Sequence, residues 1–161
     1  MTFEEYQKAA VSFRTDTANN EEYLTLGLIA EVGEAAGKLA KRRRDGVFDE
    51  KAFIKELGDI LWFVANLADY YDDADIHESL KDCFLEEVDG DRFDETIMLS
   101  LVYWVGIFLD DEDEFLADIV FEVGGLAKRY GYTLEQVAEI NIAKLRDRRA
   151  RGVIKGDGDE R

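Results

Sequence analysis

Apolar residues recur every three or four positions along most of the chain, and this spacing predicts amphipathic helices rather than strands. The first segment shows the pattern clearly, because Phe3, Tyr6, Ala10 and Phe13 fall on one stripe. The middle of the chain, at 72–94, is acidic and less regular, with one short helix expected inside it. The predicted helices span about 3–14, 21–44, 49–71, 77–87, 94–109, 113–130 and 133–149.

Local signals mark where several of these helices begin and end. The second helix closes with four basic residues at 41–44 followed by Asp45 and Gly46, which is typical of a helix C-terminus. Asp49 is suited to cap the third helix. Thr133 is suited to cap the last one, with Glu135 or Gln136 completing a capping box. The glycine-rich charged tail after 151 is expected to be a mobile flap.

Composition agrees with an all-α protein of one domain. The 161 residues include no proline and are rich in helix-forming residues. We expect the single domain, 1–161, to comprise an active helix pair at 1–71, an insertion and degenerate repeat at 72–130, and a C-terminal helix with a phosphate-closing tail at 131–161. No apolar run reaches the ~18 residues of a membrane span, and the acidic N-terminus does not resemble a secretory signal, so a cytoplasmic location is expected.

Charge and cysteine content restrict the chemistry. The formal net charge of −17 argues against a nucleic-acid partner, which needs a basic face, and so disfavours a helical DNA-binding repressor. One cysteine, Cys83, excludes an intrachain disulfide and a thiolate zinc site. With one histidine as well, any bound metal is expected to be a hard cation held by oxygen atoms.

Two segments of the chain align with two others. Residues 57–68, LGDILWFVANLA, align with 116–127, LADIVFEVGGLA, and Tyr71 then matches Tyr130. Upstream, 26–33 aligns with 99–106. This indicates a degenerate duplication of a helix pair, although two amphipathic helices can also share such a pattern by chance.

Four carboxylates stand out against this background. Glu31 and Glu34 lie three apart on one predicted helix, Glu56 and Asp59 lie three apart on the next, and residues at that spacing share a helix face. Both pairs are embedded in apolar sequence, so packing the helices together would gather four carboxylates, whose repulsion a divalent cation relieves. Glycines 33 and 58, inside the pairs, are expected to let the two helices approach closely.

The alternative is that these acids face solvent. They would then form surface ion pairs with Lys38, Lys55 and Arg42.

The two aligned copies differ at the acidic positions. In the second copy Glu31, Glu34 and Glu56 correspond to Trp104, Ile107 and Phe115, and only Asp59 keeps an acidic counterpart, Asp118. One half would then carry chemistry while the other packs against it.

An ExxE motif followed 22 residues later by ExxD resembles the signature of the MazG-like all-α nucleoside triphosphate pyrophosphohydrolases. The resemblance extends to MTFEEYQKAA, to the segments around both motifs, and to TLEQVAEINIAKLRDRRARGVIKGDGDER. It implies a helical bundle, usually assembled as a homodimer or a dimer of dimers. It also implies hydrolysis of (deoxy)nucleoside triphosphates to monophosphate and pyrophosphate, a nucleotide clean-up activity in which water attacks the α-phosphorus.

The resemblance also assigns roles to residues. It implies that Glu31, Glu34, Glu56 and Asp59 bind Mg²⁺, with Mn²⁺ as a possible substitute. The substrate-binding residues that it implies on the last helix and tail are Asn141, Lys144, Arg148, Arg151 and Lys155, and Lys38 is a further phosphate candidate.

The chain departs from the family pattern in three places. Ala30 stands where some members carry an additional glutamate, Arg149-Ala150 replaces a frequent Tyr-Pro, and most short members lack 72–114. Dimeric deoxyuridine triphosphatases of the superfamily also combine an active and a decayed half, so a preference for dUTP or dCTP is an alternative. A non-catalytic helical interaction module is the other alternative.

Overall fold

The computed structural model describes residues 1–85, 91–110 and 115–153. Within these ranges the protein is all-α, with seven α-helices and no strand, so the predicted fold class is confirmed. The helices are α1 (Phe3–Val11), α2 (Glu21–Asp45), α3 (Glu50–Tyr71), α4 (Ala74–Leu80), α5 (Asp94–Asp110), α6 (Leu116–Arg129) and α7 (Leu134–Ala150).

The predicted caps are found where the sequence placed them. Gly46 ends α2 with a φ of 70°, a left-handed conformation that favours glycine. The side chain of Asp49 accepts a hydrogen bond from the backbone N–H of Ala52 at the start of α3. Thr133 and Gln136 form a complete capping box at the start of α7.

Three predicted boundaries are wrong. The first helix ends at Val11 rather than near 14, and the Ser12 hydroxyl there donates to the backbone oxygen of Ala9 at 2.7 Å. The short middle helix occupies Ala74–Leu80 rather than 77–87, because Asp73 caps it earlier by accepting two backbone N–H bonds. The sixth helix begins at Leu116 rather than 113.

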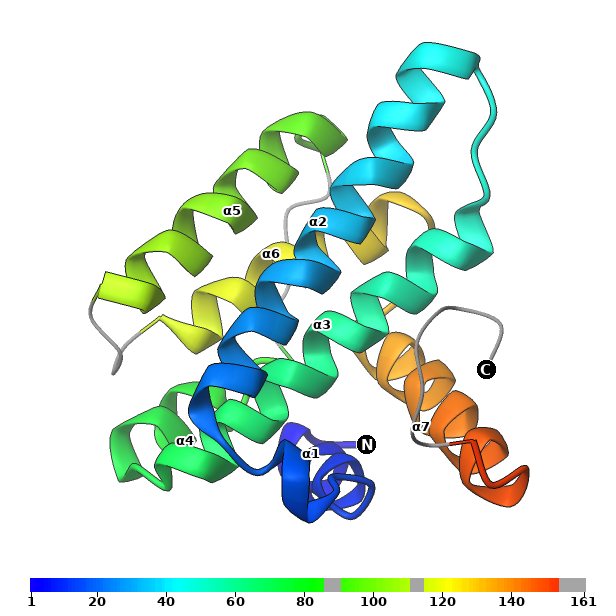
Figure 1. The fold of residues 1–161 in the computed structure, drawn as a ribbon. Coiled ribbons are helices and arrows are strands. Elements are labelled where there is room, and N and C mark those ends of the chain that lie inside the picture. Colours follow the sequence, from blue (N-terminus) through cyan, green and yellow to red (C-terminus); the bar gives the residue numbers. More distant parts are fainter. Residues whose placement is uncertain (86–90, 111–114, 154–161) are drawn as a thin grey trace.

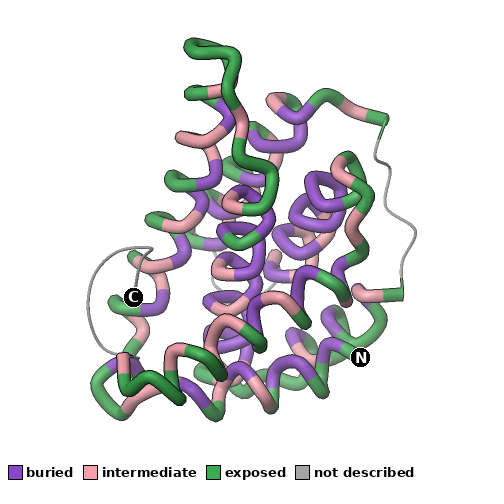
Figure 2. Tube along the Cα trace, turned by 90° about the vertical axis from the view of Figure 1, so that its right-hand side faces the viewer, coloured by how far each residue is buried: buried purple, intermediate pink, exposed green. Residues whose placement is uncertain are grey.

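The central element is α3, which contacts α1, α2, α6 and α7. In Figure 1, α2 and α3 form one antiparallel pair, α5 and α6 form a second pair beside it, and α7 packs against α3 from another side. Buried residues concentrate where these helices face one another (Figure 2), and they form one hydrophobic cluster. This packing places the middle of α3 between α2 and α7.

Within the described ranges, none of the helices combines the length and the apolar character that crossing a membrane requires.

Candidate functional site

Three of the four predicted acids meet between α2 and α3. Glu31, Glu56 and Asp59 each offer an oxygen atom, and these atoms all lie within 4.8 Å of one another. Glu56 is 2% exposed, while Glu31 and Asp59 are half-buried. Glu34 is exposed and does not join this group. We call Glu31, Glu56 and Asp59 the acid cluster.

The acid cluster is electrostatically strained. The pKa of Glu31 is raised from 4.5 to about 8, first by burial and then by the negative charges of Asp59, Glu34 and Glu56. Lys144 opposes this shift but does not cancel it. A partly buried carboxyl whose pKa is raised by neighbouring negative charges is the kind of environment that a divalent cation stabilises.

Two lysines partly neutralise the cluster. The Lys38 ammonium lies 2.7 Å from Oε1 of Glu56, and the Lys144 ammonium forms an ion pair with Oδ2 of Asp59. Both pairs are largely shielded from solvent. Ion pairing of Lys38 with an acid was expected under the surface-pair alternative, but the buried setting of Glu56 is not that of a solvated surface pair.

Asp59 is held by a second group on α7. The side-chain N–H of Asn141 donates to Oδ1 of Asp59 at 3.0 Å, and the Tyr6 hydroxyl donates to Oδ1 of Asn141 at 3.0 Å. The helical periodicity predicts Tyr6 only as a core residue. No local signal reveals its bond to Asn141, because the two residues lie 135 positions apart.

The predicted role of Gly33 and Gly58 in letting α2 and α3 approach is wrong. A Cβ atom at Gly33 would meet nothing within 4 Å, and one at Gly58 would meet Asn141 of α7 at 3.0 Å. The glycine that matters between α2 and α3 is Gly27, where a Cβ atom would overlap the ring of Phe63. The close approach is therefore one turn before Glu31.

The other predicted basic residues lie near the end of α7. Arg148 is half-buried, and the exposed Arg151 pairs with Asp147 at 2.8 Å. Lys155, like all of the predicted tail flap from 154 onward, lies outside the described residues. Away from this helix, Arg42 pairs with Asp94 rather than with a motif acid.

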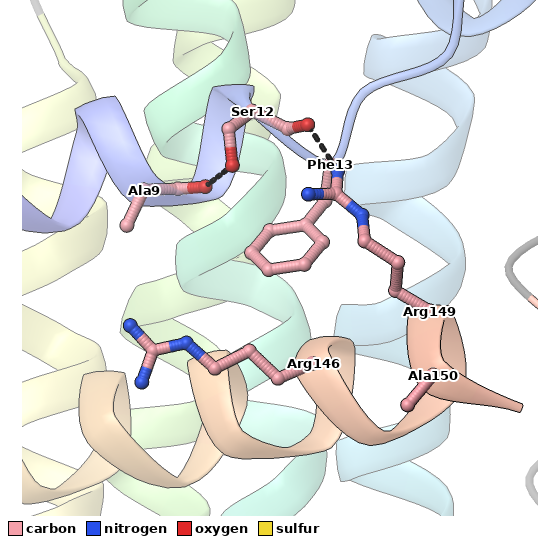
Figure 3. Close-up of a pocket in the computed structure, with 6 residues that line it drawn as sticks. All are labelled: Ala9, Ser12, Phe13, Arg146, Arg149 and Ala150. Atoms are coloured by element: carbon pink, nitrogen blue, oxygen red, sulfur yellow. Dashed lines mark hydrogen bonds between the residues drawn. The ribbon is translucent and has the colours of Figure 1, made fainter.

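A pocket of about 490 Å³ lies on the α1 side of α7. In Figure 3, Arg149 reaches across to α1, where its guanidinium covers the ring of Phe13 at 4.1 Å and donates to the backbone oxygen of Ser12. Arg146 lines the same pocket from one turn earlier on α7, and its side chain points away from Phe13 and Ser12. Since one face of Phe13 is covered by Arg149, that face is closed to a stacking ligand.

The second helix pair, α5 and α6, has contacts at positions aligned with those of the first. Glu31 and Glu56 meet between α2 and α3, and their aligned residues Trp104 and Phe115 stack with ring centroids 5.4 Å apart. Trp104 is half-buried against the core.

Two further contacts recur in the same way. Gly27 touches Phe63, and the aligned Ser100 donates to Glu122 at 2.7 Å. The hydroxyl of Tyr71 donates to Glu21 at 3.3 Å, and that of the aligned Tyr130 donates to Asp94 at 2.7 Å. Glu21 and Asp94 correspond when the alignment of 26–33 with 99–106 is extended toward the N-terminus without a gap. Three pairs of corresponding positions thus lie close together in both helix pairs.

Comparison with known proteins gives a match over the first helix pair, α2 and α3. Residues 19–89, which include all four predicted acids, match the family model described as the MazG nucleotide pyrophosphohydrolase domain. A 62-residue stretch is 40% identical to the Gene 37 protein of Mycobacterium phage L5. That match covers 35% of this chain and 54% of the phage protein, so it spans about half of the relative's length. No solved structure matches. Together with the all-α fold, the match of residues 19–89 is consistent with a MazG-like family.

Proposed function

We propose that the chain hydrolyses (deoxy)nucleoside triphosphates to monophosphate and pyrophosphate at the acid cluster. The observation that carries this proposal is the meeting of Glu31, Glu56 and Asp59 within 4.8 Å, in a setting that raises the pKa of Glu31 to about 8. The family match supports a nucleotide pyrophosphohydrolase, and the cation dependence, the substrate and the residue roles are our inference.

The donor set fits Mg²⁺ or Mn²⁺. Carboxylate oxygens are the ligands that both cations prefer, and the described acid cluster contains no histidine or cysteine. Glu31, Glu56 and Asp59 would hold the cation, with Glu34 as a fourth acid reached from the solvent side. A bound divalent cation would neutralise phosphate charge and favour ionisation of the attacking water.

The basic residues then complete the site. Lys38 and Lys144 form ion pairs with the carboxylates, and we propose that they bind phosphate oxygens when a nucleotide enters. Arg148, Arg151 and Lys155 follow along the same end of the chain and are proposed to bind the outer phosphates. Asn141 is proposed to act through Asp59, since its N–H donates to that carboxylate.

We further propose that α5 and α6 are a degenerate copy of α2 and α3. The recurrence of three contacts at aligned positions supports a duplication over chance, because chance similarity of pattern does not fix which residues touch. In the second pair, the stacked rings of Trp104 and Phe115 fill the place of Glu31 and Glu56. The chain 1–161 would then be one domain with one active helix pair.

A homodimer, or a dimer of dimers, is proposed from exposed apolar residues on α2 and α5. Leu26 and Leu99 are aligned with each other and are 65% and 71% exposed, and Tyr103 is 59% exposed. Light scattering across protein concentrations tests this, and a monomer at all concentrations would refute it.

Pyrophosphate release, measured across canonical and damaged nucleotides that include dUTP and dCTP, tests the activity. Monophosphate and pyrophosphate should form in equal amounts, whereas orthophosphate and diphosphate would mean attack at the γ-position. Replacing the acids singly should lower turnover by about two orders of magnitude or more while leaving the helical fold intact. The variants are Glu31→Gln, Glu34→Gln, Glu56→Gln and Asp59→Asn, with Asp118→Asn as the matched control from the second helix pair. Wild-type rates in two of the four would refute the cation site.

Thermal melting separates the enzyme from a non-catalytic interaction module. The enzyme should be stabilised by Mg²⁺ or Mn²⁺ because these cations bind the folded state, and a module should be indifferent to them. The acid variants should lose this stabilisation.

A further inference from the structure

A row of three hydrogen-bonded side chains leads from α1 through α7 to the acid cluster on α3. Tyr6 donates to Asn141 at 3.0 Å, and Asn141 donates to Asp59 at 3.0 Å. Tyr6 is 0% exposed and Asn141 is 1% exposed. Water therefore does not compete for these hydrogen bonds. A polar group in this row that lost its partner could not replace it with water.

The chemistry of the three groups fixes the direction of the row. An ionised carboxylate only accepts hydrogen bonds, so the amide NH₂ of Asn141 must face Asp59 and its carbonyl must face Tyr6. The Tyr6 hydroxyl satisfies that carbonyl as a donor. Burial, with a smaller contribution from the charge of Asp59, holds the pKa of Tyr6 well above its usual range, so the hydroxyl stays protonated.

Backbone packing supports the same arrangement. A Cβ atom at Gly58 would lie 3.0 Å from Cβ of Asn141, so α7 approaches α3 closely at the residue before Asp59. The backbone oxygen of Gly58 is 3.5 Å from the Tyr6 hydroxyl. Just before α1, the N-terminal ammonium pairs with Glu135 of α7. α1 is thus held against α7 on the N-terminal side of this row.

We propose that Tyr6 is a positioning residue for the cation site, which orients the Asn141 amide and through it the carboxylate of Asp59. The inference rests on the proposed function, because it assumes that Asp59 holds a cation. Without the hydroxyl, the carbonyl of Asn141 loses its donor and the amide is no longer fixed toward Asp59. Loss of such an outer partner typically lowers metal affinity by about 10- to 100-fold.

The test measures binding of Mn²⁺ alone to the full chain, from the electron paramagnetic resonance signal of free Mn²⁺ in a titration to millimolar concentration. Tyr6→Phe keeps the ring and removes only the hydroxyl. Tyr71→Phe is the matched control, because it removes a tyrosine hydroxyl that bonds to Glu21, away from the acid cluster. Circular dichroism confirms that each variant is folded.

Tyr6→Phe should weaken Mn²⁺ binding about tenfold or more, and Tyr71→Phe should bind as the wild type does. In an Asn141→Ala background, Tyr6→Phe should cause no further weakening, because the pathway through the amide is already removed. Unchanged binding in Tyr6→Phe, or equal weakening in both backgrounds, would overturn the role of Tyr6 while leaving the cation site intact. A wild-type protein that binds no Mn²⁺ would overturn the cation site itself, and this inference with it.

Discussion

Replacing Glu31 with glutamine should make the metal-free protein more stable and the enzyme much less active. In the folded chain the pKa of Glu31 is raised from 4.5 to about 8 by burial and by the neighbouring carboxylates. A carboxyl whose pKa is raised on folding favours the folded state when protonated. That contribution is complete below pH 4.5 and is lost as the pH rises to about 8.

The magnitude follows from the same shift. At roughly 1.4 kcal/mol for each pKa step, the change from 4.5 to about 8 sets a ceiling of about 5 kcal/mol. Glu31 is only half-buried, and solvent screening reduces the expected effect to about 2 kcal/mol. At pH 5, where little of this contribution has been lost, the carboxyl and the glutamine amide should give similar stability. At pH 9 without metal, Glu31→Gln should exceed the wild type by about 2 kcal/mol, or roughly 4–8 °C in Tm.

Urea unfolding in EDTA at pH 5 and pH 9 measures this difference. Millimolar Mn²⁺ at pH 9 should then stabilise the wild type more than the variant, because the cation removes the repulsion that the glutamine avoids. Pyrophosphate release by the variant should be at least about 100-fold slower. The reasoning would be refuted by a variant that is no more stable than the wild type at pH 9, or that hydrolyses nucleotides at the wild-type rate.

Three further outcomes are expected. Between about pH 5 and pH 8, the affinity for Mn²⁺ should rise by up to about tenfold per pH unit, because the cation displaces the proton of Glu31; calorimetric titrations that show a flat profile would contradict this. Gly27→Ala should destabilise the fold by about 1–3 kcal/mol and slow turnover, since the added methyl group overlaps Phe63 and separates the helices near the acids; a variant with wild-type stability in urea would show that the contact is not tight. Trp104→Ala should cost about 2 kcal/mol, less than the roughly 3–5 kcal/mol of a fully buried aromatic residue, and should leave the KM for nucleotide unchanged; a selective loss of activity would place Trp104 in the site.

The acid cluster illustrates what the sequence can predict. Spacing of three residues places two acids on one helix face, and a short connection places the next helix alongside, so the meeting of Glu31, Glu56 and Asp59 follows from local rules. The exposure of Glu34 does not follow from them. It depends on how α2 is rotated against α3, and the packing of Gly27 on Phe63 contributes to that rotation.

The support of the cluster is harder to predict for the same reason. Asn141 and Lys144 reach Asp59 from α7, and Tyr6 reaches Asn141 from α1. The periodicity of these helices shows only which face is apolar. The caps at Asp49 and Thr133 were predictable because each involves residues only three positions apart. Contacts between helices that are distant in the chain produce no comparable signal in the local sequence.

The ion pairs of Lys38 and Lys144 have a consequence for the order in which ligands bind. Each ammonium is paired with a carboxylate that the proposed cation needs. In the absence of nucleotide, the metal must therefore compete with the two lysines for these carboxylates. A triphosphate offers those lysines other anionic partners. Metal and nucleotide should therefore bind cooperatively, and by thermodynamic reciprocity each should raise the affinity of the other by the same factor. In a cell this would keep the site largely free of metal until a nucleotide arrives with its own magnesium. Binding of the cofactor would then depend on the presence of the substrate.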